Sequence, residues 1–211
     1  MEDLEQIAEQ IRSDFEARNT ARDEALSASR ILIRHASHAI RAIHRSDWDE
    51  AQSKLEEANV LAEKLRSSLA DYPDLFFSGY TQDALKEFSE AHITCALIQN
   101  QPLPKPEDLR VEGATYLNGL AETVGELRRR CMDILRQGYS QEAERLLGCM
   151  DDIYSVLVTM DYPDAITFGL RRHTDLVRGI VERTRGDLTI SLREQHLESA
   201  LADLSHKLDE A

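Results

Sequence analysis

The sequence predicts an all-α fold in which one bundle of helices takes up the whole chain. Glycine and proline, which favour turns, contribute only 9 and 5 of the 211 residues. Apolar residues recur at the helical spacing of three to four positions along most of the chain. The alternation typical of strands is not found, nor are sequence repeats, low-complexity tracts or an interdomain linker. We therefore expect a single helical domain over 1–211.

The first half of the chain is expected to hold three helices. The first covers 4–45, as one long helix or two in series. The segment 46–49, with the sequence SDWD, breaks it and supplies a capping residue followed by acids for the next first turn. The second helix covers 48–70, where alanine and leucine recur at helical spacing. A short connection, 71–81, precedes the third helix over 82–98.

The second half begins with the clearest loop of the sequence, which has three prolines within 102–106. The helices expected after it cover 114–136, 140–160, 164–185 and 187–208, which brings the total to seven. Gly138 and Gly186 are expected to end the first and third of these, because glycine readily adopts the left-handed conformation that closes a helix.

The chain as a whole is acidic, with a formal net charge of −14. Taken as a sum, this charge disfavours nucleic acid as a partner, since phosphates attract lysine and arginine. No apolar run approaches the ~20 residues needed to span a bilayer, and the acidic N-terminus is unlike a secretory signal. The three cysteines, Cys95, Cys131 and Cys149, are far apart in the sequence. The sequence therefore predicts a cytoplasmic protein without membrane spans, disulfides or a zinc site.

One segment departs from this acidic balance. Residues 25–45 hold four arginines and three histidines and no acidic residue. Their spacing places all four arginines and one histidine on one helix face, opposite an apolar face. We call this set the cationic strip, and its members are Arg30, Arg34, His38, Arg41 and Arg45. The strip is roughly 22 Å long at the α-helical rise, which is enough to follow several phosphates of a nucleic acid backbone.

Two interpretations of the cationic strip remain open. In the first, it binds RNA. Because no aromatic residues lie between the arginines, the strip favours contact with the backbone and shape of a duplex over base stacking. In the second, the strip is an ordinary solvated face that pairs with acids of a neighbouring helix or subunit.

Two helices each carry a pair of glutamates at helical spacing. Glu87 and Glu90 lie in a narrow polar strip between two apolar arcs, so their carboxylates are expected to be desolvated unless a cation pairs with them. Glu122 and Glu126 lie opposite the apolar stripe of their helix, near Gly125, which leaves room for another element. Carboxylates from two helices suit Mg²⁺ or Mn²⁺, which can activate water for phosphodiester cleavage. Acidic pairs are also ordinary surface features of helices, so the pattern leaves that interpretation open.

At these residues the sequence resembles the translin–TRAX family. The run ALKEFSEA at 84–91 resembles one helix of TRAX, and the run YLNGLAETVGEL at 116–127 resembles another. The C-terminal part, from Tyr162 to Asp187, is also similar, especially to archaeal members. The order and separation of these segments extend the resemblance over nearly the whole chain.

The resemblance implies a seven-helix subunit in a closed homo-oligomeric shell, an octamer, that encloses RNA. It also implies endoribonuclease activity that depends on a divalent metal such as Mg²⁺ or Mn²⁺. The catalytic, metal-binding carboxylates of TRAX match Glu87, Glu90 and Glu122, and Glu126 matches a neighbouring acid. Translin subunits lack the first pair, so this chain resembles the catalytic type.

Two departures from the family pattern affect this expectation. Glu122 stands where the family has aspartate, and its extra methylene could shift the metal geometry. Translin's basic, histidine-rich stretch is matched here by 78–81, with the sequence SGYT. The cationic strip is therefore expected to carry more of the RNA contact.

The main prediction is thus a metal-dependent endoribonuclease. The alternative is a non-catalytic translin-type protein that binds single-stranded or duplex nucleic acid, DNA included. A ferritin-like di-metal enzyme fits less well, because it needs Glu-x-x-His pairs, and Glu90 and Glu122 are followed at that spacing by Ile93 and Gly125. A plain helical scaffold leaves the acid-free run 25–45 unexplained.

Overall fold

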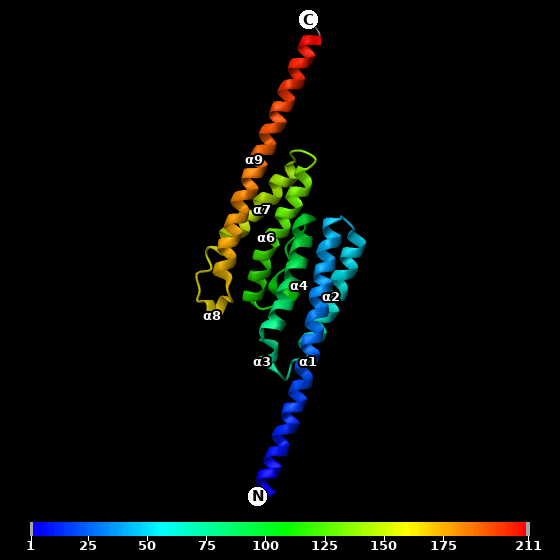
Figure 1. Ribbon diagram of the computed structural model, residues 1–211, viewed down its shortest axis with the longest axis vertical. Coiled ribbons are helices and arrows are strands. Elements are labelled where there is room, and N and C mark those ends of the chain that lie inside the picture. Colours follow the sequence, from blue (N-terminus) through cyan, green and yellow to red (C-terminus); the bar gives the residue numbers. More distant parts are fainter. Residues whose placement is uncertain (1, 210–211) are drawn as a thin grey trace. The chain divides into compact units, whose positions relative to one another are not determined.

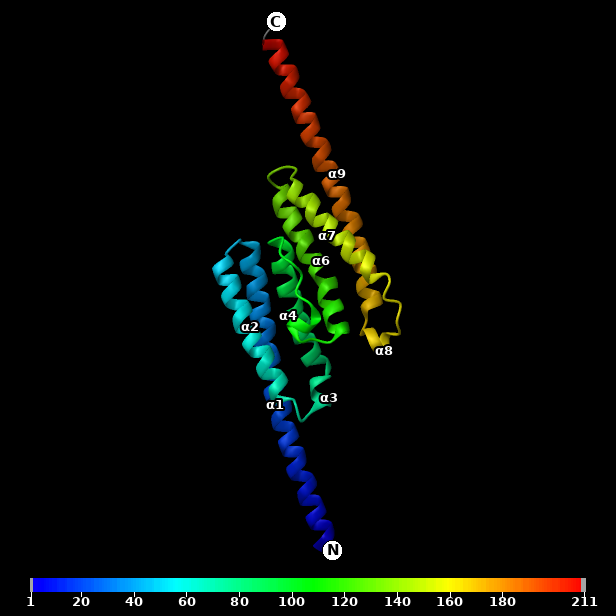
Figure 2. The same cartoon turned by 180° about the vertical axis from the view of Figure 1, so that it is seen from behind.

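The computed structural model describes residues 2–209, and all the regular structure in them is helical, as predicted (Figures 1 and 2). The helices are α1 Glu2–His44, α2 Trp48–Ser68, α3 Pro73–Phe76, α4 Gly79–Ile98, α5 Pro106–Leu109, α6 Gly113–Leu135, α7 Gln141–Leu157, α8 Asp164–Thr167 and α9 Leu170–Asp209. Among these described residues, no helix is long and apolar enough to cross a membrane. The chain divides into two compact units, Met1–His92 and Ile93–Ala211, and the boundary falls inside α4. The expectation of a single domain over 1–211 stays a prediction.

In the first unit, α1 and α2 form a hairpin (Figure 1). The chain reverses at Ser46, whose φ of 57° lies in the left-handed region. Asp47 then caps α2, because its carboxylate accepts a hydrogen bond from the backbone N–H of Glu50 at 3.2 Å. The side of α2 that is buried is rich in alanine, which allows close packing, and consists of Ala51, Leu55, Ala58, Ala62 and Leu65. The break and cap expected at 46–49 are confirmed.

The fourth helix begins at Gly79, earlier than the expected start at Gln82. The hydroxyl of Thr81 donates to the carbonyl of Leu75 at 2.9 Å, and the side-chain amide of Gln82 donates to the carbonyl of Phe76 at 2.9 Å. These bonds satisfy carbonyls at the end of α3 that lack a helical partner. The polar residues that favour a turn in the sequence therefore join the end of one helix to the start of the next.

In the second unit, α6, α7 and α9 pack together as a bundle (Figures 1 and 2). The chain leaves α6 through Gly138, which has a φ of 107°, and Ser140 caps α7 by accepting from the backbone N–H of Glu142 at 3.2 Å. Both signals were read correctly from the sequence. The buried residues of the bundle include Leu120, Val124, Leu127, Cys131, Leu146, Met150, Val181 and Leu188.

The expected division of the C-terminal region into helices over 164–185 and 187–208 is wrong. A break occurs earlier, where Phe168 and Gly169 adopt positive φ values of 50° and 86°. After this break, α9 runs without interruption over Leu170–Asp209. The left-handed pair thus ends the short α8, and the long helix starts after it.

Gly186 lies inside α9 and does not end it. A glycine in a helix interior costs only ~1 kcal/mol relative to alanine. The buried face of α9 continues past it, because Thr184 and Leu188 are both buried against the bundle. Packing on both sides of Gly186 therefore outweighs its weak local preference for a helix end.

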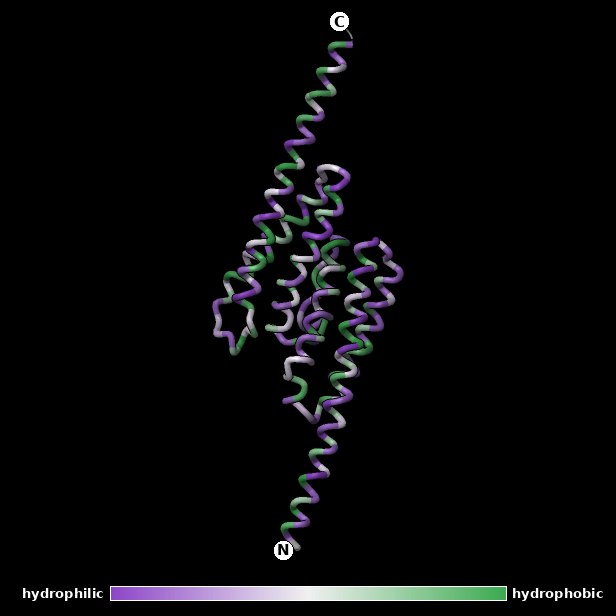
Figure 3. The backbone as a smooth tube through the Cα atoms, viewed as in Figure 1, coloured by the Kyte–Doolittle hydropathy of each residue, from purple (hydrophilic) through white to green (hydrophobic). Residues whose placement is uncertain are grey.

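Both terminal stretches of helix expose regular apolar residues (Figure 3). The N-terminal stripe consists of Leu4, Ile7, Ile11 and Phe15, which are 45% to 67% exposed. The C-terminal stripe consists of Leu197, Leu201, Leu204 and Leu208, which are 54% to 68% exposed. Apolar residues that alternate at steps of three and four are typical of helices that pack against other helices.

Candidate functional site

The cationic strip lies on the solvent side of α1, where its four arginines are all exposed and His38 is half-buried. On the opposite face, Leu32, Ala36 and Ile43 are fully buried, with 0% of their surface exposed. The separation of a cationic from an apolar face, predicted from spacing alone, is confirmed. At one end of the strip, His38, Arg41 and Arg45 line a hollow of about 300 Å³ together with Glu50 of α2.

Acidic neighbours neutralise only one end of the strip. Arg45 forms an ion pair with Glu50. Within residues 2–209, no ion pair is found for the other three arginines of the strip. His35 lies off the strip, and its Nδ1 is 2.8 Å from a carboxylate oxygen of Glu57, which links α1 to α2. The strip is therefore mostly open to an anionic partner in the first unit.

On α4, Glu87 and Glu90 occupy the polar strip between two apolar arcs, as predicted. Glu90 is only 7% exposed, and the side chain of Glu87 is 29% exposed. The apolar arcs on either side are buried and include Ala84, Leu85, Phe88, Ala91, Ile93 and Leu97. Nζ of Lys86 lies 3.6 Å from a carboxylate oxygen of Glu87. A buried carboxylate is costly unless cations or hydrogen bonds compensate it, so this position favours a cationic partner.

On α6, Glu122 and Glu126 share a half-buried face, opposite the buried Leu120 and Val124. Gly125 lies between the two glutamates in the sequence. A methyl group in place of its hydrogen would meet no atom within 4 Å. The expectation that another element approaches the helix at Gly125 is therefore not met by the described residues. The glutamate face of α6 is therefore open at Gly125.

Consecutive arginines follow on α6 and differ in their contacts. Arg128 donates to the hydroxyl of Thr184 at 3.0 Å and pairs with Asp187 at 2.8 Å, so it holds α6 to α9. Arg129 lies on the glutamate face, and its Nη1 is 3.9 Å from Oε2 of Glu126. The glutamate face of α6 thus carries a cation of its own.

Two other titratable groups on the same helices, His92 and Cys131, are neutral. Burial lowers the pKa of His92 to about 4, and its ring packs edge-on against Phe88 with the centroids 4.6 Å apart. Burial also raises the pKa of Cys131 to about 12. At pH 7 neither group carries a charge. The electrostatics of each glutamate face therefore depend on the carboxylates and on the cations beside them.

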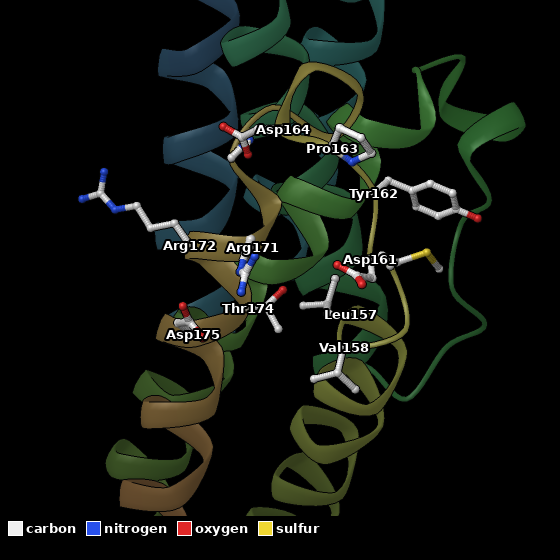
Figure 4. A pocket seen from close by; sticks show the side chains of 12 residues that line it. Leu157, Val158, Asp161, Tyr162, Pro163, Asp164, Arg171, Arg172, Thr174 and Asp175 are labelled. Carbon is white, nitrogen blue, oxygen red and sulfur yellow. Dashed lines mark hydrogen bonds between the residues drawn. The ribbon is translucent and has the colours of Figure 1, made fainter.

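A larger hollow, of about 1040 Å³, lies at the connection between α7 and α9 (Figure 4). Arg171 and Asp161 point into it, whereas Arg172 points away. Asp164 and Asp175 also line it, so three aspartates outnumber the one arginine that points inward. The hollow contains none of the candidate catalytic, metal-binding or RNA-binding residues, and its excess of acids disfavours a phosphate ligand.

Comparison with known proteins identifies the family, although no family model matches the chain. The chain is 34% identical over 197 residues to an uncharacterised protein of Methanocaldococcus jannaschii, covering 90% of this chain and 86% of that protein. It also matches the solved structure of AfC3PO, a protein of the translin–TRAX type, in complex with duplex RNA. That match has a TM-score of 0.83 and 34% identity, over 89% of this chain and 97% of AfC3PO.

The chain belongs to the translin–TRAX family. A second AfC3PO structure matches with a TM-score of 0.82 at 33% identity, over 89% of this chain and 97% of that one. Apo-NeC3PO, at 22% identity and a TM-score of 0.80, shares the fold, over 87% of this chain and 96% of that one. The all-α translin-type fold and the family resemblance expected from the sequence are thereby confirmed.

Sequence reasoning missed two features of this translin–TRAX chain. Arg129 follows Glu126 at the i+3 position, a spacing that places it on the glutamate face and could have been noticed. The C-terminal stripe was read as an ordinary helix over 187–208. Its leucines at steps of four, three and four are the signal of a packing face.

Proposed function

We propose that this translin–TRAX chain is the subunit of a homo-oligomeric endoribonuclease that depends on Mg²⁺ or Mn²⁺. The observation that carries the proposal is the pair of carboxylates on α4. Glu90 is only 7% exposed, and the side chain of Glu87, one turn away on the same helix, is 29% exposed. Two carboxylates this close to each other and poorly hydrated suit a shared divalent cation. We assign Glu122 of α6 to the same ion because it matches a metal-binding carboxylate of the family.

The donor set fits a hard divalent cation. Carboxylate oxygens are the ligands that Mg²⁺ and Mn²⁺ prefer, and a site with few protein ligands leaves room for water and a phosphate. When bound, the ion would activate water and stabilise charge on the phosphate and the leaving oxygen. We assign Glu126, one turn beyond Glu122, to orienting the attacking water or completing the ion's ligands.

We assign Glu122 as a ligand although the family has aspartate at its position. Both side chains end in a carboxylate, so the type of donor that the ion prefers is kept. We propose that water attacks the phosphorus and that the P–O3′ bond breaks. The 3′-oxygen then leaves and takes up a proton, so the expected products carry a 5′-phosphate and a 3′-hydroxyl.

The cationic strip is the proposed RNA contact of the subunit. Its exposed arginines present guanidinium groups that suit phosphate oxygens. AfC3PO, which is 34% identical, has been solved in complex with duplex RNA, and this supports duplex RNA as a substrate. Single-stranded RNA and DNA of the same length are the competitors against which that preference is measured.

Self-association is supported by the N-terminal and C-terminal stripes. An isolated helix is marginally stable in water, so exposed apolar stripes on helical ends favour burial against other copies of the chain. We take the number of copies, eight, from the family resemblance. A closed assembly also reconciles the net charge of −14 with RNA binding, because acids can dominate the outside while the cationic strips face the interior. We propose the cytoplasm as its compartment, which keeps its three cysteines reduced.

The test of this function is the substitution Glu90→Gln, which removes a charge and keeps the shape of the side chain. Labelled RNA is incubated with the wild-type protein and the variant, with Mn²⁺ or with EDTA. We expect cleavage by the wild type in Mn²⁺ alone. We expect the variant to bind RNA but to cleave it roughly 100-fold more slowly or worse, because a lost ligand removes several kcal/mol of transition-state stabilisation.

Glu56→Gln is the matched control, since Glu56 is exposed on α2 and hydrogen-bonds only locally, to Gln52. This control should cleave like the wild type. Equal cleavage by Glu90→Gln would remove the mechanism. Binding without cleavage that EDTA abolishes would instead identify a non-catalytic translin-type protein.

A further inference from the structure

We propose that Arg129 and the open backbone at Gly125 form a phosphate-binding subsite that positions the nucleic acid strand beside the glutamates of α6. The inference rests on the proposed function for the identity of the ligand, RNA. It adds a positioning residue to that site, because Arg129 would hold a phosphate next to the one that is cleaved.

The residues of this subsite share one helix face. Glu122, Gly125, Glu126 and Arg129 follow one another at steps of three, one and three, so they span about two turns, or roughly 10 Å of α6. Side chains on a helix lean toward its N-terminus. The guanidinium of Arg129 therefore lies over the turn that contains Gly125, and its Nη1 is 3.9 Å from Oε2 of Glu126.

Arg129 retains most of its capacity to bind an anion. Its side chain is 54% exposed, and 3.9 Å is too long for a hydrogen bond to Glu126. Within residues 2–209, no hydrogen bond from the Arg129 guanidinium is found. The adjacent Arg128 differs, because it is committed to Thr184 and Asp187. A planar guanidinium with free N–H groups matches two oxygens of a phosphate.

Gly125 provides the second, independent observation. Glycine in a helix interior is less favourable than alanine, and a close contact usually explains its presence. No atom lies within 4 Å of the position that a methyl group at Gly125 would occupy, so nothing inside the described chain requires glycine there. A ribose-phosphate backbone could approach the helix at this point, one turn before Arg129.

Electrostatics give this arrangement a role in binding. A phosphate approaching Glu122 and Glu126 meets two carboxylates, and like charges at short range disfavour its approach. Arg129 stands on the same face and offsets that repulsion on the phosphate next to the reacting one. The glutamate face of α6 can thereby bind an RNA strand that its glutamates alone would repel.

The test compares Arg129→Gln with Arg136→Gln. Arg136 is exposed at the C-terminal end of the same helix, so both variants change the net charge equally. RNA affinity is measured in EDTA over a range of salt concentrations, and KM and kcat are measured in Mn²⁺. For Arg129→Gln we expect about tenfold higher Kd and KM with kcat nearly unchanged, which is the loss of one charge-assisted contact. We also expect the salt dependence of log Kd to be less steep by about 0.7 to 0.9, the value for one phosphate contact.

Arg129→Lys should recover the salt dependence of binding but only part of the affinity, because lysine keeps the charge and cannot donate two parallel hydrogen bonds to a phosphate. If Arg129→Gln does not fold, Arg129→Lys replaces it as the variant in which RNA affinity is measured. The inference is overturned if Arg129→Gln changes Kd and the salt dependence no more than Arg136→Gln does. The measurements in EDTA test this inference separately from the proposed function. A wild type that binds RNA but does not cleave it would contradict the proposed nuclease activity. The Arg129 subsite would still be tested by the salt dependence of RNA binding.

Discussion

The cationic strip and the glutamate pairs are both clusters of like charge, yet they differ in spacing and in exposure to water. The strip spreads four exposed arginines along one face of α1. Glu87 and Glu90 lie one turn apart on α4, and Glu90 is only 7% exposed. Separated charges in water are screened and act nearly independently. Charges that are close and poorly hydrated act as a unit, so a single substitution should matter far more among the glutamates.

The largest expected effect follows from Glu122. The substitution Glu122→Gln should lower kcat/KM with Mn²⁺ by roughly 100-fold or more, since one neutral ligand disrupts the whole set. Glu122→Asp should stay within about tenfold of the wild type, because it keeps the charge and restores the residue of the related TRAX subunits. Glu112→Gln, at the exposed N-cap of α6 with no side-chain capping bond, is the control. Equal kinetics for Glu122→Gln and this control would show that α6 does not contribute to an ion site.

The strip should respond gradually. We expect the combined replacement of its four arginines by glutamine to weaken RNA binding roughly 50- to 100-fold at moderate salt and to reduce the salt dependence of log Kd by about 3. Arg34→Gln alone should weaken binding only about threefold, and kcat at saturating RNA should not change. The control with the same charge change replaces Arg136, Arg172, Arg183 and Arg193, which are exposed elsewhere. If this control weakens binding as much, only net charge matters and the strip has no special role.

The two clusters also differ in how far the sequence could predict them. The strip lies on one helix, so spacing alone placed Arg30, Arg34, Arg41 and Arg45 on a common exposed face. Spacing likewise placed Glu90 between apolar arcs on α4. Spacing could not assign Glu122, on a different helix, to the same site as Glu87 and Glu90, because that depends on tertiary packing. Only the family resemblance supplied that assignment.

Where sequence signals were local and weak, packing overrode them. Gly186 was expected to end a helix, but burial of Thr184 and Leu188 carries α9 through it. Gly125 was expected to admit another element, but the space beside it is open. A glycine in a sequence states only which conformations and approaches are permitted, and the neighbours that decide between them are distant in the chain.

A smaller effect is expected from disrupting self-association, which tests whether the strip acts across several copies. The double substitution Leu201→Glu and Leu204→Glu places charges in the C-terminal stripe and should reduce the oligomer size measured by light scattering. Binding to a long duplex should weaken about tenfold, because linked strips raise the effective concentration of binding sites. Binding to a short duplex, and cleavage per subunit, should change little. The double substitution Gln195→Glu and Ser199→Glu, at exposed positions of the same helical stretch outside the stripe, controls for the change in charge. An oligomer of unchanged size would leave the C-terminal stripe without this function.

The smallest expected effect concerns the gap at Gly125. The substitution Gly125→Ala should stabilise the protein by up to ~1 kcal/mol, because alanine favours the helix and its methyl group meets no atom within 4 Å. The midpoint temperature of thermal unfolding should then rise by about 2 to 4 °C. Gly148→Ala on α7 is the matched control, since Gly148 is also helical and free of neighbours within 4 Å. If RNA approaches the helix at Gly125, only that variant should also raise KM, by about threefold, which corresponds to under 1 kcal/mol. Equal KM values for both variants would mean that the open space beside the glutamates is not used by the substrate, and the acidic face of α6 would then act through its charges alone.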